Sequence, residues 1–258
     1  MNTIPPVFLS HGSPMLLLEP GRSGPAWQTL AQTLPRPRAI LAVSAPWPPR
    51  VPAISATPHP ATIHDFHGFP DALYDMEYPA PGSAELAAQV AGLIPEIQID
   101  ARRGLDHGAW SPLRVMYPQA DIPVIQLSVM PGADAATHFL LGRKLESLTR
   151  DGVLVLASGG LTHNLGDMVP DAPDGAALRH VAEFRDWFAA ALARHDLPAL
   201  MQWETLAPHA RRAHPTPEHL LPLFVALGAA GEAARVDNFH RDYQLGALAL
   251  DAFRFDPA

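Results

Sequence analysis

Short runs of apolar residues alternate with amphipathic stretches along the whole chain. Apolar runs of about four to eight residues, bounded by turn residues, are typical of buried strands. The clearest example is GVLVLASGG (152–160), which ends in a pair of glycines, and IPVIQLSV (122–129) is similar. This pattern predicts strands at 5–10, 39–44, 51–57, 96–100, 122–129 and 152–160.

Most of the segments between these runs have the apolar spacing of helices. SAELAAQVAGLI (83–94) begins with Ser83, a favourable N-cap residue. TPEHLLPLFVALGAAG (216–231) predicts a helix with Thr216 as its N-cap and Pro217 in its first turn. We also predict helices at 26–34, 135–149 and 176–195, a loop leading into a short helix at 108–118, a long loop at 58–82 and a terminal hairpin at 234–255.

The alternation of strands and helices predicts an α/β fold, namely a sandwich with a central mostly parallel or mixed sheet and helices on both faces. No flexible linker, charge run or internal repeat divides the chain, so we expect residues 1–258 to form a single domain. The strand order cannot be read from the sequence. The aromatic content of loop 58–82 favours a functional loop over a disordered one.

Charge and composition narrow the range of partners. The formal net charge is −8, so no basic surface indicates nucleic acid or an anionic membrane as a partner. No apolar stretch approaches the roughly 20 residues that span a bilayer. The N-terminus lacks the basic region of a signal peptide, and the chain has no cysteine. We therefore expect a cytoplasmic protein, and its oligomeric state stays open.

Histidine is the informative residue type, with 13 in 258 residues. His11 directly follows VFLS, and His163 follows VLVLASGG. His107 lies in LDHGAW, and His219 lies in PTPEHLLPL within the first turn of the predicted helix. Because strand ends converge on one edge of an α/β sheet, we predict that these four histidines share one site.

Metal chemistry is the interpretation that fits such a cluster best. Neutral imidazole is the commonest transition-metal ligand, and two histidines with a carboxylate or a third histidine leave positions open on Fe(II) or Zn(II). The chain has no CxxC, HExxH, P-loop or GxSxG motif. A serine hydrolase that uses Ser44 or Ser158 stays open as an alternative.

Several motifs, in consistent order between about residues 6 and 231, resemble those of the 4,5-DOPA extradiol dioxygenase family, a branch of the class III extradiol ring-cleaving dioxygenases. They include FLSHGSPML, TIHDFHGFP, LYDMEYPAPG, RGLDHGAWSPLRVMYP, GVLVLASGGLTHNLGD and HPTPEHLLPLFVALGAAG. The resemblance implies an α/β sandwich that holds one Fe(II) or Zn(II) per chain and no organic cofactor. The implied reaction inserts both atoms of O₂ into a small catechol.

The same resemblance assigns expected roles to the four histidines. It implies that His11 and His219 are metal ligands and that His163 is a ligand or an acid–base residue. It also implies that His107 forms hydrogen bonds with substrate or oxygen. Asp106 and Asn164 adjoin these histidines and could fix their tautomers. An arginine could hold a substrate carboxylate, and aromatic residues could form the pocket wall, namely Trp47, Phe66, Phe69, Tyr74 and Trp110.

One position departs from the family pattern. The family usually reads Ser-Ala-His-Trp after its second strand, with that histidine as a metal ligand, whereas this chain reads Ser44-Ala45-Pro46-Trp47. Proline has no side-chain donor atom. Three outcomes stay open: His67 replaces the missing ligand, His163 becomes a full ligand, or the metal and the activity have been lost. The alternatives to a dioxygenase are therefore a metal-dependent hydrolase and a non-catalytic descendant that binds a small aromatic ligand or a partner.

Overall fold

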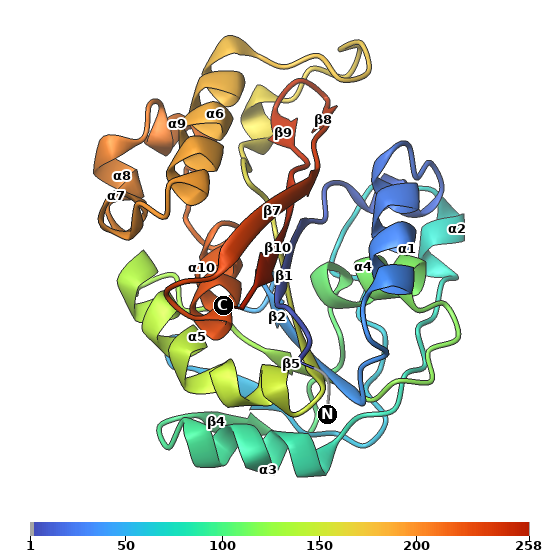
Figure 1. Cartoon of the computed structure of the whole chain (residues 1–258). Coiled ribbons are helices and arrows are strands. Elements are labelled where there is room, and N and C mark those ends of the chain that lie inside the picture. The colour runs from blue at the N-terminus through green and yellow to red at the C-terminus, as the bar shows by residue number, and fades with distance from the viewer. Residues whose placement is uncertain (1–2, 258) are drawn as a thin grey trace.

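The computed structural model describes residues 3–257, which are built around a mixed eight-stranded sheet (Figure 1). The strand order is β4-β3-β5-β2-β6-β1-β10-β7. The central pairs β2–β5, β2–β6 and β1–β6 are parallel, whereas β3–β5, β1–β10 and β10–β7 are antiparallel. The strands are β1 (Val7–Ser10), β2 (Ala39–Ser44), β3 (Ala53–Ser55), β4 (Gln98–Asp100), β5 (Val124–Leu127), β6 (Val153–Gly159), β7 (Arg235–His240) and β10 (Ala252–Asp256).

Helices cover both faces of this sheet (Figure 1). One face packs against η1 (Pro14–Leu17), α1 (Ser23–Thr33), α2 (Asp71–Tyr74) and α4 (His107–Met116). The other packs against α3 (Ala84–Leu93), α5 (Ala135–Arg150), α6 (Arg179–Ala193) and α10 (Leu221–Ala230). The predicted α/β class with helices on both faces is confirmed. The smaller elements are η2 (Leu165–Asp167), α7 (Leu197–Met201), α8 (Trp203–Leu206), α9 (Ala210–Ala213), β8 (Tyr243–Gln244) and β9 (Leu248–Ala249).

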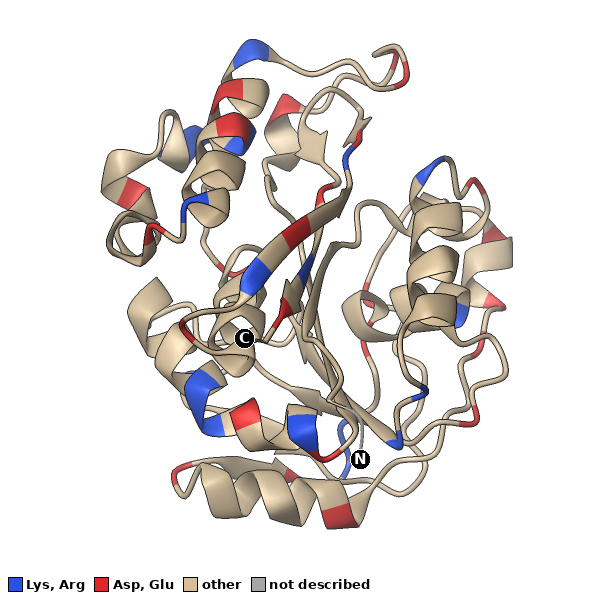
Figure 2. Cartoon of the chain, in the orientation of Figure 1, with Lys and Arg blue, Asp and Glu red and all other residues tan. Residues whose placement is uncertain are grey.

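The central strands are apolar on both sides because both of their faces are covered. In β2, Leu41 and Val43 join the core beneath α5 and α10, whereas Ile40 and Ala42 join the core beneath α1 and α4. Successive side chains of a strand point to opposite faces, so a continuous apolar run is what a doubly covered strand requires. Charged residues lie mainly on the outer helices and loops, with both signs interspersed (Figure 2).

The helix expected at 216–231 begins later than predicted, at Leu221. Proline lacks an N–H, so Pro222 fits only the first turn of a helix and could not continue one that began at Pro217. Residues 217–220 instead form a turn, in which the Leu220 N–H donates to the Pro217 carbonyl. His219 therefore precedes the helix, and the prediction that it lies in the first turn is wrong.

Other boundaries also differ from the predictions. The helix expected at 176–195 spans Arg179–Ala193, and the loop expected at 58–82 contains the short helix α2. The terminal hairpin is confirmed as the antiparallel pair β7–β10, with the small β8–β9 ribbon inserted between them. Among the helices of residues 3–257, none combines the length and the apolar character needed to cross a membrane.

Two glycines allow α5 and α10 to pack closely. A Cβ atom on Gly142 would lie 2.2 Å from the Val225 carbonyl oxygen, and one on Gly228 would lie 2.1 Å from that of Phe139.

We predict that Gly142→Ala destabilises the protein by about 1–3 kcal/mol, because the helices must separate to admit the methyl group. Urea unfolding measures the change. Gly92→Ala is the matched control, since a Cβ there meets nothing within 4 Å, and we expect it to be neutral or stabilising. Equal effects of the two substitutions would contradict the packing argument.

Candidate functional site

The parallel strands β2, β6 and β1 are neighbours, so their carboxyl ends lie together at one edge of the sheet. Pro46 follows β2, His163 follows β6, and His11 directly follows β1. The His11 N–H donates to the Gly159 carbonyl over 2.9 Å, and its ring Nδ1 lies 2.9 Å from Ser158 Oγ. These contacts fix the ring and leave Nε2 free for another partner.

His219 is brought to the same edge by a close approach of two backbones. Its carbonyl oxygen accepts a hydrogen bond from the Gly160 N–H over 2.8 Å. A Cβ atom on Gly159 would lie only 2.0 Å from that oxygen, so a larger residue would push the two segments apart. The late start of α10 makes this contact available, because the His219 carbonyl is not used within the helix.

His163 and His219 lie in direct contact. Their rings are stacked, with centroids 3.3 Å apart and planes inclined by 8°. Glu218 Oε1 lies 3.2 Å from His219 Nδ1. His163, Glu218 and His219 each offer a ligand atom, and these atoms lie within 4.8 Å of one another. The sequence analysis did not identify Glu218 as part of the site, although Glu218 directly precedes His219 and could have been identified from that position.

His107 is held by Asp65, which the sequence analysis did not identify as a site residue. Asp65 Oδ1 accepts hydrogen bonds from the His107 backbone N–H and from Nδ1 of its ring, over 2.9 and 2.8 Å. Burial raises the pKa of Asp65, but the hydrogen bonds and the charge of His107 outweigh it and lower the pKa below its usual value. Asp65 is therefore a carboxylate at neutral pH and fixes the ring orientation of His107.

The two residues expected to fix histidine tautomers have other roles. Asp106 caps α4 by accepting from the Ala109 N–H, and it also accepts from Ser44 Oγ. The Asn164 amide donates to the Arg212 carbonyl and to Asp167. Both residues are thus engaged elsewhere, and in this respect the prediction is wrong.

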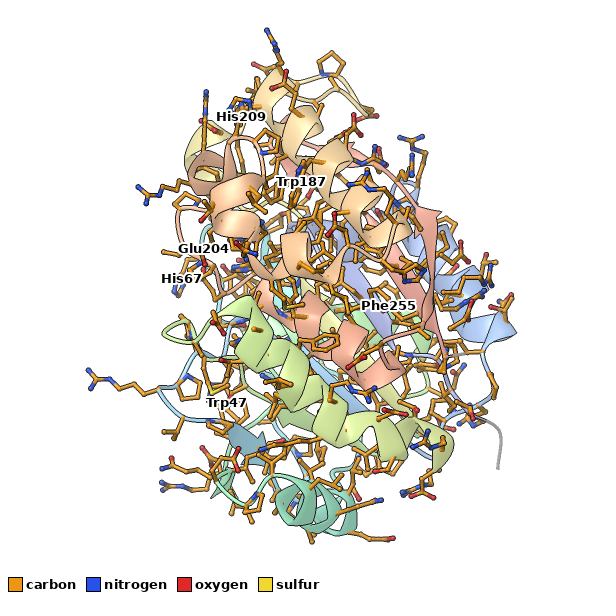
Figure 3. All side chains as sticks on the ribbon, turned by 60° about the vertical axis from the view of Figure 1, so that its left-hand side comes forward. Trp47, His67, Trp187, Glu204, His209 and Phe255 are labelled. Carbon is orange, nitrogen blue, oxygen red and sulfur yellow. The ribbon has the colours of Figure 1, made fainter. Side chains whose placement is uncertain are left out.

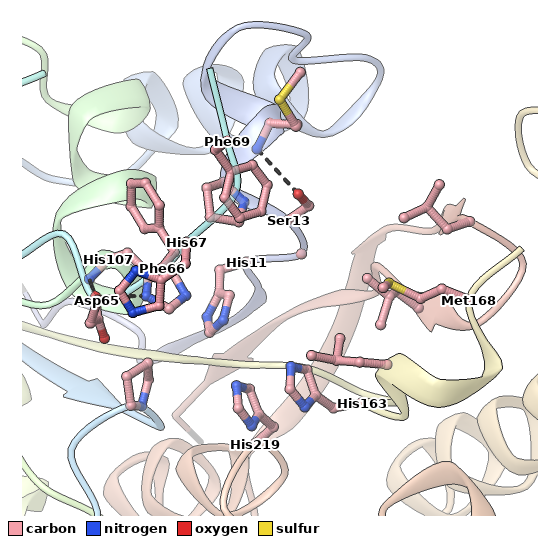
Figure 4. A pocket seen from close by; sticks show the side chains of 17 residues that line it. His11, Ser13, Asp65, Phe66, His67, Phe69, His107, His163, Met168 and His219 are labelled. Atoms are coloured by element: carbon pink, nitrogen blue, oxygen red, sulfur yellow. Dashed lines mark hydrogen bonds and ion pairs between the residues drawn. The ribbon is translucent and has the colours of Figure 1, made fainter. Parts of the chain in front are cut away.

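The four predicted histidines line one cavity of about 820 Å³ (Figure 4). The ring centroid of His11 lies 5.2 Å from that of His107 and 5.5 Å from that of His219. The structure therefore brings together the set that the strand-end pattern predicted. Phe66 and Phe69 also line this cavity, whereas Trp47, Tyr74 and Trp110 are not part of its lining.

Burial keeps the imidazoles of His11, His163 and His219 neutral. It lowers the pKa of His11 well below 6.5, and the neighbouring imidazoles His107, His219 and His163 lower it further. Burial and the adjacent His219 lower the pKa of His163 to about 2. Burial also lowers the pKa of His219, against the opposing effect of Glu218. Neutral imidazole is the form that coordinates metal ions, so protons do not compete for these nitrogens at neutral pH.

Pro46 lines the same cavity, beside His11. A Cβ atom on Gly108 would lie 3.0 Å from Pro46 Cδ and 3.3 Å from His11 Cε1, so both side chains pack against that glycine. His67 also lines the cavity, but it is exposed, and Figure 3 shows it at the surface. It lies outside the group formed by His163, Glu218 and His219. Ser44 and Ser158 are fully buried and do not line the cavity.

Comparison with known proteins agrees with this architecture. Residues 6–249 match the family described as the catalytic LigB subunit of aromatic ring-opening dioxygenase. The chain is 42% identical to a 4,5-DOPA dioxygenase extradiol of Escherichia coli (strain K12), over 96% of this chain and 93% of that one. It is 39% identical to the protein of the same name from Beta vulgaris, over 96% and 95% of the two chains.

A solved structure has the same fold. The crystal structure of an uncharacterized protein from Escherichia coli K12 superposes with a TM-score of 0.83 and 34% sequence identity, covering 97% of this chain and 99% of that one. The sequence motifs, the mixed sheet with its histidine-lined edge and these relatives all agree: the chain belongs to the LigB family of aromatic ring-opening dioxygenases.

Proposed function

We propose that this protein is a metal-dependent extradiol dioxygenase that opens the ring of a small catechol with O₂. The observation that carries the proposal is the group of neutral imidazoles beside Glu218, which lie on the wall of a cavity large enough for an aromatic ligand. The names of the relatives, 4,5-DOPA dioxygenase extradiol, support the same reaction class.

The donor set fits one Fe(II) or Zn(II) ion. His163, His219 and Glu218 would hold it, since their ligand atoms lie within 4.8 Å of one another, and His11 lies beside them with its Nε2 free. Two imidazoles and a carboxylate leave coordination positions open for substrate and O₂. Bound Fe(II) would supply the redox link between catechol and O₂, so no organic cofactor is needed.

His107 is suited to move the proton of a substrate hydroxyl. Asp65 holds the His107 proton on Nδ1, which leaves Nε2 as the acceptor. A carboxylate in this position stabilises the ring after it takes up a proton, and it keeps the ring in one orientation. His163 would share this acid–base role only if it does not bind the metal.

We expect Asp65→Asn to lower kcat about 10- to 100-fold, because the amide keeps the acceptor oxygen but loses the charge that stabilises protonated His107. Asp65→Ala should cost more, since it also removes the hydrogen bonds that orient the ring. Steady-state kinetics between pH 5.5 and 9 measure both effects. A purely structural role for Asp65 would leave the shape of the pH profile unchanged in Asp65→Asn and would contradict this assignment.

Anaerobic loading with Fe(II), followed by a panel of catechols in air, tests the proposed function. We expect oxygen uptake and yellow ring-opened products with at least one catechol. Ester or amide cleavage with Zn(II) and no oxygen uptake would instead indicate a hydrolase. A protein that binds neither metal nor catechol would be a non-catalytic descendant.

A further inference from the structure

The cavity above the histidines is much larger than one catechol ring requires. Its volume of about 820 Å³ lies in the range of pockets that enclose drug-sized ligands. Away from the histidines, its lining is mainly apolar, with Ser13 and Asp65 as polar exceptions, and the larger apolar side chains come from four separate segments of the chain. These residues are Pro14, Met15, Phe66, Phe69, Leu165, Met168, Leu245 and Leu248.

Within residues 3–257, no lysine or arginine lines this cavity. The arginines near the site are engaged elsewhere: Arg212 pairs with Asp167, and Arg103 pairs with Asp106. The charged side chain in the described lining is instead the negative Asp65. A ligand carboxylate would lose its hydration here without gaining a cationic partner, which is unfavourable.

A ligand ammonium group is no better matched by this lining than a ligand carboxylate is. Asp65 is the lining carboxylate, and its Oδ1 already accepts two hydrogen bonds from His107. An ammonium paired with either oxygen of Asp65 would offset the negative charge that holds the ring of His107. The arginine that could have held a substrate carboxylate is thus absent from the described lining, and the carboxylate that lines it is already engaged with His107.

Apolar side chains also form the outer wall of the cavity. Leu165 and Met168 line it while being 54% and 37% exposed, unusually open positions for residues of their size. In Figure 4, Met168 lies on the far side of His163 from His107, and Phe69 lies near His67. An apolar group on a ring bound at the histidines would cover these side chains and remove them from water.

We propose that the substrate is a catechol with an uncharged, apolar side chain of several carbons. This inference rests on the proposed function, and it sets the protein apart from relatives named for DOPA, whose side chain carries both an ammonium and a carboxylate. The catechol ring lies against the histidines, and the side chain lies along Met15, Leu165 and Met168.

A panel of catechols that differ only in their side chain tests the inference on the Fe(II)-loaded full-length protein. It comprises 4-propylcatechol, dihydrocaffeic acid, dopamine and DOPA, with oxygen uptake giving kcat/KM. We expect 4-propylcatechol to exceed each charged compound at least about tenfold. From 4-methyl- to 4-butylcatechol, kcat/KM should rise about fourfold per methylene. A charged compound that matches or exceeds 4-propylcatechol would overturn the inference.

Binding to the Zn(II)-loaded protein, measured by calorimetry without O₂ turnover, separates this inference from the proposed function. If no catechol is cleaved, the proposed function fails. Tighter binding of 4-propylcatechol than of the three charged compounds still supports the apolar preference. Equal or weaker binding of 4-propylcatechol, or no binding at all, overturns it.

A pair of variants at Leu165 tests the cause of the preference. Leu165 is exposed, so Leu165→Arg and its uncharged control Leu165→Gln should both fold. Both variants lose the apolar contact of Leu165, but only arginine adds a cation, so we expect the ratio of kcat/KM for dihydrocaffeic acid to that for 4-propylcatechol to be about tenfold higher in Leu165→Arg than in Leu165→Gln. Equal ratios in the two variants would contradict the argument from the missing cation. A carboxylate preference of the unmodified protein that disappears in His67→Ala would assign the carboxylate to His67 and overturn the inference.

Discussion

Pro46→His should raise the affinity for Fe(II) or Zn(II) about tenfold or more, which corresponds to about 1.4 kcal/mol of binding free energy. Pro46 lines the cavity beside His11, in a turn at the carboxyl end of β2. An imidazole there adds a nitrogen donor next to a group that already holds His163, Glu218 and His219. Metal content after dialysis, with affinity from competition against a chelator, measures the change.

The control for this variant is Pro46→Ala, which removes the ring without adding a donor. We expect its metal affinity to stay within about twofold of that of the unmodified protein, a change small beside the tenfold gain expected for Pro46→His. A Pro46→His protein that folds and binds metal no more tightly than Pro46→Ala would show that position 46 is not a vacant ligand position. The remaining donors would then form the whole coordination set.

His219→Ala should abolish metal retention and lower kcat/KM at least about 10³-fold, because it removes a proposed ligand that contacts both other members of the group. It also removes the ring that stacks on His163. Metal analysis and oxygen uptake measure the two losses, while circular dichroism confirms that the variant folds. His59→Ala, at an exposed position in the loop after β3, is the control and should change neither quantity.

Glu218→Gln separates a ligand role from a positioning role. The amide has the same shape and can still contact His219, so a positioning role predicts nearly unchanged metal content. A ligand role predicts a loss of metal affinity of about tenfold or more, because the carboxylate charge is lost. If His219→Ala retained metal at a full equivalent, the assignment of this group as the metal site would be wrong.

The layout of the fold could be predicted because its central strands are buried on both faces. Runs such as Ile40–Val43 and Val153–Ala157 have no alternating polar positions, which distinguishes them from strands with a solvated face. The strand order could not be predicted, since it depends on which segments pair across the sheet. The start of α10 was misplaced because Thr216 and Pro217 form a start signal, whereas Pro222 determines the actual start.

The histidines could be predicted as one site because strand ends determine their positions. Their partners could not, because each depends on a contact between distant segments. Asp65 and His107 are 42 residues apart, and only the folded loop brings them together. Asp106 directly precedes His107, but a helix begins there, and its carboxylate caps that helix. Pro46 lines the same cavity, since it follows β2, whose end lies beside that of β6.

The proposed reaction of this site inserts both atoms of O₂ into a catechol. The most direct test is mass spectrometry of the ring-opened product formed by Fe(II)-loaded protein under ¹⁸O₂, with each catechol of the panel as substrate. We predict that both labelled oxygen atoms appear in the product and that oxygen and catechol are consumed in equal amounts. A ring-opened product with one labelled atom or none, or the absence of any product from fully loaded protein, would contradict the proposal.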